Sequence, residues 1–249
     1  MTQSRCKAIL TGHSRGLGAA IAAQLLAAGV EVLAISRAQN SDLQAADGPP
    51  IRQLALDLAD LTALARWLAT DELKAFLADS TRALLINNAG VVTPIGPLAM
   101  QTEQAIAQAI AVNISAPMML SAAFARQAPV SADRRLLHVS SGAGRNAVAG
   151  WSVYGATKAA LDHHARGIAA DGDRGLRVCS LAPGVIDTDM QGQIRASTLE
   201  QFPQRARFDS LKQDGGLATP HDCARRLVAH LLSDSFGSQV VADLRELSG

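Results

Sequence analysis

Short apolar runs alternate with helix-like segments along almost the whole chain, and this alternation is what most constrains the fold. Most runs are continuously apolar and of strand length, as in strands covered on both faces. They are Lys7–Thr11, Val30–Ile35, Ile51–Leu56, Ala83–Ile86, Leu136–Ser140, Leu176–Leu181 and Gln239–Ala242. The segments between them, such as Leu17–Ala28 and Ala156–Ala170, are rich in alanine, the strongest helix former. The pattern predicts one α/β domain over residues 1–249, with a parallel sheet between two layers of helices.

Composition excludes several classes of function. The 249 residues carry a formal net charge of +1 and 3% aromatic residues, whereas nucleic-acid binding needs a basic face or stacking aromatics. No stretch approaches the roughly 20 uninterrupted apolar residues of a membrane span, and the N-terminus does not follow the pattern of a signal peptide. Cys6, Cys179 and Cys223 are widely spaced, which favours reduced thiols. We expect a cytoplasmic protein with no nucleic-acid or membrane partner.

A long polar stretch over residues 187–216 interrupts the alternation. It follows the sixth apolar run and precedes a final helix expected to begin near Pro220. Phe202 and Phe208 are isolated apolar residues in this stretch, which ends in Gly215-Gly216. A long insertion between regular elements is usually a lid or a disordered segment. We predict a lid.

The first apolar run ends in a glycine-rich turn, Thr11-Gly12-His13-Ser14-Arg15-Gly16-Leu17-Gly18, and a helix follows at once. Glycines let backbone N–H groups at the start of a helix approach a phosphate closely. An ordinary strand-to-helix turn is the alternative. The strand before the turn and the helix after it favour a site for a dinucleotide pyrophosphate.

The fourth apolar run leads into Asn87-Asn88-Ala89-Gly90. Asparagine and glycine at this position are compatible with a plain turn. In an open α/β sheet, however, ligands bind outside the carboxyl ends of the strands. The motif therefore indicates, without proving, a second part of the same ligand site.

Tyr154 and Lys158 give the strongest indication of chemistry. Tyr154 is the only tyrosine, and Lys158, one of four lysines, follows four residues later, so that both share one face of a helix. A lysine cation beside a phenol is expected to lower the phenol pKa from about 10, which suits a general acid or base. Ser141, thirteen residues before the tyrosine, offers a hydroxyl to the same substrate oxygen. The alternative is a buried tyrosine beside a surface lysine.

Together these motifs resemble the short-chain dehydrogenase/reductase family over nearly the whole chain. The matching pieces are TGHSRGLG at 11–18, NNAG at 87–90, Asn113, Ser141, YGATK at 154–158 and Pro183-Gly184 with Thr188. The resemblance implies a Rossmann-like, doubly wound parallel sheet of seven strands and NAD(P)-dependent carbonyl/alcohol chemistry. It also implies a homodimer or homotetramer with contacts through helices near 102–127 and 152–170. The stretches 187–191 and 236–245 look like the branch of sepiapterin and benzil (diketone) reductases.

The resemblance also implies roles for single residues. Tyr154 would be the general acid/base, Lys158 would bind the nicotinamide ribose and tune the phenol, and Ser141 would orient the substrate oxygen. Asn113 would hold a helix bend and a water of the proton relay. The cofactor-binding set would be Gly12, Ser14, Arg15, Gly16, Leu17, Gly18, Arg37, Asp57, Leu58, Asn88, Ala89, Gly90, Tyr154, Lys158, Pro183, Gly184, Ile186 and Thr188. No metal site is predicted. Trp151 lies three residues before Tyr154, and lining of the pocket and packing in a core or interface both remain open.

The end of the second apolar run predicts which cofactor is preferred. Sites for NAD place a carboxylate there, against the ribose 2′-OH. Here the run ends in Ser36-Arg37 with no acidic residue before Asp42, and Arg15 lies in the glycine turn. Two guanidinium groups suit a 2′-phosphate, unless both are merely solvated. We therefore predict an NADP(H)-dependent reductase of a small-molecule carbonyl or secondary alcohol. Alternatives are a redox sensor without catalysis and, less compatible with the chain length, a nucleotide-sugar epimerase or dehydratase.

Overall fold

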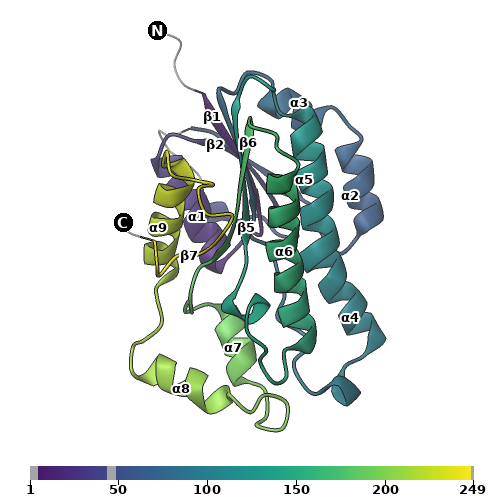
Figure 1. Ribbon diagram of the computed structural model, residues 1–249, viewed down its shortest axis with the longest axis vertical. Coiled ribbons are helices and arrows are strands. Elements are labelled where there is room, and N and C mark those ends of the chain that lie inside the picture. Colours follow the sequence, from purple (N-terminus) through teal and green to yellow (C-terminus); the bar gives the residue numbers. More distant parts are fainter. Residues whose placement is uncertain (1–4, 44–48, 248–249) are drawn as a thin grey trace.

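A seven-stranded parallel sheet forms the centre of the computed structural model, which describes residues 5–43 and 49–247 (Figure 1). The strands are β1 (Cys6–Thr11), β2 (Glu31–Ser36), β3 (Ile51–Ala55), β4 (Arg82–Asn87), β5 (Asp133–Val139), β6 (Leu176–Ala182) and β7 (Val241–Asp243). Their order is β3-β2-β1-β4-β5-β6-β7, and every neighbouring pair is parallel. The order reverses between β1 and β4, which opens a crevice at the carboxyl ends of these two strands. The predicted fold class is confirmed.

Helices cover both faces of the sheet (Figure 1). They are α1 (Gly16–Ala27), α2 (Leu61–Leu68), α3 (Glu72–Leu77), α4 (Glu103–Ile110), α5 (Ala116–Gln127), α6 (Ser152–Ala170), α7 (Asp189–Arg195), α8 (Arg205–Gln213) and α9 (Pro220–Leu232). Ile21 of α1 and Leu227 of α9 pack against one face. Leu64 of α2, Phe124 of α5 and Ala165 of α6 belong to the core on the other face. The two apolar layers explain why the strands are apolar along their whole length.

Strand β5 begins three residues earlier than the apolar run suggests, because ion pairs neutralise its charged residues. Arg135 is fully buried, and its guanidinium binds the Asp133 carboxylate and the carbonyl oxygens of Leu231 and Ser233 at the end of α9. Arg177 also binds Asp133, at 2.8 Å, and these pairs hold the Asp133 pKa far below its usual value. A strand can therefore run through Asp133-Arg134-Arg135 without leaving an unpaired charge in the interior.

A π turn, Ala111–Ser115, joins α4 to α5 in one helical stretch, Glu103–Gln127. By length and composition alone this stretch is apolar enough to cross a membrane, although Asn113, Ser115 and Pro117 interrupt its apolar sequence. Here Leu120 and Phe124 pack against the sheet. The buried face accounts for the apolar composition.

Residues 187–216 contain α7 and α8, which lie beyond the carboxyl ends of the strands, at the bottom of Figure 1. Phe202 and Phe208 are not isolated, as the sequence suggested. They are buried with Trp151 and Tyr154 in an aromatic cluster, and the Trp151 and Phe202 rings stack with centroids 4.7 Å apart. Helices α7 and α8 are therefore anchored on the start of α6, instead of forming an unstructured insertion.

Candidate active site

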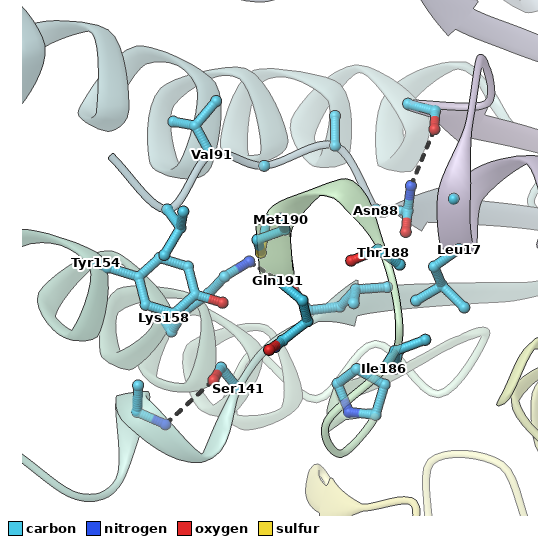
Figure 2. Close-up of a pocket in the computed structure, with 18 of the residues that line it drawn as sticks. Leu17, Asn88, Val91, Ser141, Tyr154, Lys158, Ile186, Thr188, Met190 and Gln191 are labelled. Atoms are coloured by element: carbon cyan, nitrogen blue, oxygen red, sulfur yellow. Dashed lines mark hydrogen bonds between the residues drawn. The ribbon is translucent and has the colours of Figure 1, made fainter. Parts of the chain in front are cut away.

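A cavity of about 660 Å³ lies at the carboxyl ends of the central strands. Every site residue predicted from the sequence lines this cavity except Asn113. Figure 2 shows Ser141, Tyr154 and Lys158 on one side of it and Leu17, Asn88 and Thr188 on the other. The volume is within the range typical of small-molecule and cofactor sites.

The glycine turn between β1 and α1 has the shape required to hold a phosphate. Gly16 has φ +56°, and a Cβ on it would project to 3.4 Å from Cγ2 of Thr188 across the cavity. A Cβ on Gly18 would lie 1.9 Å from the carbonyl oxygen of Gly12, so only glycine fits there. Arg15 precedes α1 without a side-chain cap, which leaves N–H groups of the first turn for a ligand. The residues present thus fit a dinucleotide.

Asn88 connects the second motif to the glycine turn. Its side-chain Nδ2 donates to the carbonyl oxygen of Thr11 at 2.9 Å. The Thr11 hydroxyl in turn accepts from the backbone N–H groups of Asn88 and Ala89, both at 3.0 Å. The two motifs, far apart in sequence, thus form one rigid wall at the end of β1 and β4.

Tyr154 and Lys158 lie near the start of α6, and both are buried. Nζ of Lys158 is 5.7 Å from the centroid of the Tyr154 ring and donates to the carbonyl oxygen of Val139 at 2.8 Å. The backbone N–H of Ala143 donates to the Ser141 hydroxyl at 3.2 Å, which fixes that hydroxyl just beyond β5. A phenol, a hydroxyl and an ammonium group therefore line one part of the cavity, as the sequence predicts.

The direction of the tyrosine pKa shift differs from the expectation. Burial raises the pKa of the Tyr154 phenol, and the neighbouring Ser141 hydroxyl lowers it only in part. Burial also lowers the pKa of Lys158 to about 8. The reason is that desolvation disfavours whichever form is charged, and it is the largest influence on the pKa of both groups.

Asn113 lies in the π turn, fully buried behind the cavity wall. Its amide accepts from the N–H of Val91 and donates to the carbonyl oxygen of Val91, both at 2.8 Å. A Cβ on Gly90 would lie 3.4 Å from Oδ1 of Asn113 and 3.5 Å from Nζ of Lys158. The structure has a π turn at Asn113, where a helix bend was expected, and the Asn113 amide and Lys158 both lie beside Gly90.

Asp162 was not identified from the sequence. It lies one helical turn after Lys158, is 2% exposed, and raises the pKa of that lysine by its negative charge. The Ser180 hydroxyl and the Arg145 guanidinium hold its carboxylate at 2.7 and 3.1 Å. The i, i+4 spacing of Lys158 and Asp162 was the available signal.

The two arginines predicted for the cofactor differ in their surroundings. Arg37 is exposed at the cavity edge, and within residues 5–43 and 49–247 no ion-pair partner contacts it. Arg15 binds the Asp189 carboxylate on α7 at 3.0 Å. Arg37 is therefore free to bind a phosphate, whereas Arg15 would have to give up its ion pair with the Asp189 carboxylate to bind one.

The substrate end of the cavity is formed mostly by residues that the sequence did not assign to the site. They include Trp151, Met190, Gln191, Ile194, Arg207 and Phe208, most of them from α7 and α8. Trp151 lines the cavity and also packs in the aromatic cluster, so both possibilities left open for it are found. Its position three residues before Tyr154 was the sequence signal. For residues 187–216 the signals were the predicted lid and the likeness of residues 187–191 to one branch of the family, and neither assigned Met190, Gln191, Ile194, Arg207 or Phe208 to the wall.

Fold and cavity define a dinucleotide-binding oxidoreductase, and comparisons with known proteins agree. The family model described as short chain dehydrogenase matches residues 7–199. A benzil reductase of Bacillus cereus that forms (S)-benzoin is 34% identical over 236 residues, 92% of this chain and 94% of that protein. A sepiapterin reductase of Meriones unguiculatus is 31% identical over 250 residues, 94% of each. The crystal structure of a short-chain dehydrogenase/reductase from Burkholderia vietnamiensis shares 46% identity and a TM-score of 0.69 over 98% of this chain and 100% of that one.

The chain belongs to the short-chain dehydrogenase/reductase family. Within it, the similarity places the chain in the branch of benzil and sepiapterin reductases. It is therefore an oxidoreductase of carbonyl and alcohol groups in small molecules, with an NAD(P) cofactor.

Proposed function

We propose that this enzyme uses NADPH to reduce a 1,2-diketone, or a related carbonyl with oxygen on the neighbouring carbon, and that Tyr154 is the proton donor. The observation that carries the proposal is the burial of Tyr154 and Lys158 beside Ser141 in one cavity, opposite the glycine turn. A redox sensor has no need of a buried phenol placed in this way.

The chain's own residues account for the proton side of the reaction. When bound, the nicotinamide supplies a hydride to the carbonyl carbon. The Ser141 hydroxyl and the Tyr154 phenol hold the carbonyl oxygen, and Tyr154 transfers its proton to that oxygen as negative charge develops. Because burial keeps the phenol protonated, Tyr154 is prepared to act as an acid in the direction of reduction. Lys158 stabilises the phenolate that remains, and Asn113 fixes the loop beside it.

Arg37 supports the choice of NADPH. It lines the cavity at the end of β2, where a site for NADH would carry a carboxylate. Gly12, Ser14, Arg15, Gly16, Leu17 and Gly18 would hold the phosphates, Asp57, Leu58, Asn88, Ala89 and Gly90 the adenosine side, and Pro183, Gly184, Ile186 and Thr188 the nicotinamide side. The free guanidinium of Arg37 is suited to the 2′-phosphate.

The cavity wall supports the class of substrate. Benzil, the substrate named for the Bacillus cereus relative, has a phenyl ring on each of two adjacent carbonyl carbons. The wall here presents Trp151 and Phe208, whose ring centroids are 5.6 Å apart in an edge-on arrangement. Aromatic side chains pack favourably against aryl groups in this geometry.

We also propose that residues 187–216 form a lid that closes over the substrate end, and that the enzyme is a cytoplasmic homodimer or homotetramer. Helices α7 and α8 supply the wall of the substrate end, and Arg15 and Asp189 join α7 to the glycine turn. The apolar helical stretch Glu103–Gln127 is incompletely buried and is available for contact with a second copy.

A spectrophotometric screen tests the function directly. Purified protein is supplied with NADPH or NADH and with benzil, an aliphatic ketone, a pterin or an acyl-carrier thioester. We expect NADPH oxidation to be fastest with benzil, together with formation of benzoin. Tight binding of NADPH without turnover of any carbonyl would instead indicate a redox sensor.

A further inference from the structure

Two buried polar atoms in the wall of the main cavity have no partner. Among the residues that the structure describes, nine buried side-chain nitrogen or oxygen atoms lack a hydrogen bond, and two belong to residues that line this cavity. These are Nε1 of Trp151 and Oε1 of Gln191, each in a side chain on a residue that is 7% exposed. Buried polar groups are nearly always hydrogen-bonded, so each exception needs an explanation. One explanation is a ligand that forms a hydrogen bond with each of these two atoms.

The two residues come from different elements and meet at the catalytic end. Trp151 is the residue before α6, and its ring lies edge-on to that of Tyr154, with centroids 5.3 Å apart. Gln191 is the third residue of α7, and Figure 2 shows it between the side of the cavity that carries Ser141 and Lys158 and the side that carries Thr188. Both residues therefore lie in the part of the cavity wall that adjoins Ser141 and Tyr154, the residues proposed to hold the reacting oxygen.

The aromatic cluster holds the indole ring of Trp151 in place. Trp151 stacks on Phe202 at 4.7 Å and meets Phe208 edge-on at 5.6 Å, so its ring is held on both sides. A donor held in this way needs no reordering when a ligand arrives, which favours binding. Gln191 complements it, because an amide both donates and accepts.

We propose that Trp151 and Gln191 form a subsite for the second oxygen of the substrate, the one on the carbon next to the reacting carbonyl. This inference rests on the proposed function. A hydroxyl at this place accepts from Nε1 of Trp151 and donates to Oε1 of Gln191. A second ketone accepts from Nε1 of Trp151 and, after the Gln191 amide turns by 180°, from the amide NH2 that then stands in the place of Oε1. A carbonyl compound without that oxygen leaves both groups unpaired, and a site built for hydrogen bonds discriminates strongly against such analogues.

A matched pair of substrates tests the subsite. Benzil and deoxybenzoin have the same two phenyl rings, but deoxybenzoin has a methylene group in place of the second carbonyl. The variants are Trp151→Phe and Gln191→Leu, and kcat and KM are measured for both substrates and for NADPH. Controls are Trp67→Phe, whose indole binds Glu72 outside the cavity, and Gln213→Leu, exposed at the end of α8.

We expect each cavity variant to lower the ratio of kcat/KM for benzil to kcat/KM for deoxybenzoin about 10-fold, equal to about 1.4 kcal/mol, whatever loss of aryl packing the two substrates share. The ratio of the two substrates is insensitive to partial loss of folded protein, because both would lose activity equally. Controls should keep the wild-type ratio. Equal losses for both substrates would overturn the subsite, and so would a raised KM for NADPH at an unchanged ratio, since Gln191 would then serve the cofactor.

Calorimetry separates this inference from the proposed function. With NADP⁺ present, binding of benzil and deoxybenzoin is measured for wild type and both variants. If the wild type turns over neither compound but binds benzil more tightly, and the variants lose that preference, the proposed function is wrong and the subsite stands. If the wild type reduces benzil and the variants keep its preference over deoxybenzoin, the function stands and the subsite is wrong.

Discussion

The two halves of the cavity are built in different ways. The cofactor half consists of turns directly after β1, β2 and β4, in which Gly18 and Asn88 are fixed by contacts with the backbone of neighbouring turns. The substrate half consists of Trp151 and residues of α7 and α8, which reach the cavity through side-chain packing. The first is held by contacts with backbone atoms of neighbouring turns, such as Asn88 with Thr11, and the second by contacts between aromatic side chains.

This difference indicates where the enzyme can change its specificity. Substituting Gly18 would push a Cβ into the carbonyl of Gly12, so the cofactor half tolerates little variation. Side chains of α7 and α8 face a cavity on one side and solvent on the other, and can vary without disturbing the sheet. The proposed proton donor lies at the border between the halves: Tyr154 belongs to the aromatic cluster, and the neighbouring Lys158 donates to the backbone of β5.

Replacing Tyr154 with Phe should have the largest effect, and it should affect turnover without affecting cofactor binding. We expect turnover to fall at least about 100-fold, the range for loss of a positioned general acid, because the phenol proton is gone. NADPH binding should remain nearly intact, since the cofactor half is untouched. Steady-state kinetics and NADPH titration by fluorescence provide the two measurements. A Phe variant that reduces a confirmed substrate at close to the wild-type rate would contradict the mechanism.

Arg37→Asp should damage the cofactor half alone. A charge-assisted contact is worth about 1.5–3 kcal/mol, so NADPH affinity should fall roughly 10- to 100-fold. The KM for the carbonyl substrate should stay unchanged. Arg174→Asp, an exposed change in the turn before β6, is the charge-matched control. Wild-type enzyme that favours NADH, or a variant with unaltered NADPH affinity, would refute the assignment.

Lys158→Met tests whether burial at the border between the two halves makes the free energy of unfolding depend on pH. Burial lowers the pKa of Lys158 from 10.5 to about 8. Between these values the unfolded chain binds more protons than the folded one, so the wild-type free energy of unfolding gains with rising pH. Relative to the variant, we expect a gain of about 1–3 kcal/mol from pH 8 to pH 10. Urea unfolding at several pH values measures it, with Lys74→Met, an exposed lysine of α3, as a control that should show no such gain.

Hydrogen exchange should show that the substrate half moves more than the cofactor half. We expect amides of residues 187–216 to exchange several-fold more slowly with NADPH and substrate than without ligands, because lids close on binding. Amides of β1 and β4 should change little. Equal protection of residues 187–216 in both states would exclude the lid.

The sequence predicts the fold, and its motifs mark residues that the structure brings together in one cavity, because both signals are local. Apolar runs mark the strands, and contiguous motifs mark Gly18, Asn88 and Lys158. The start of β5 was missed because ion pairs made across the sheet allow Asp133 in a strand. The burial of Phe202 and Gln191 was missed because residues 187–216 are polar in sequence and acquire a buried face only when packed against the start of α6. The sign of the Tyr154 shift was missed because burial is a property of the folded chain.

The π turn between α4 and α5 absorbs one extra residue in an otherwise α-helical stretch. Each residue turns an α-helix by about 100°, and a π turn accommodates one residue more than an α turn. Deleting a single residue within Ala111–Ser115 would therefore allow regular α-helix throughout, while α4 and α5 kept nearly the same faces toward the sheet. Phe124 would stay in the core, but the wide turn in which Asn113 bonds to Val91 would be gone. A one-residue deletion here would thus spare the core and remove the support that Asn113 gives to the loop at Val91.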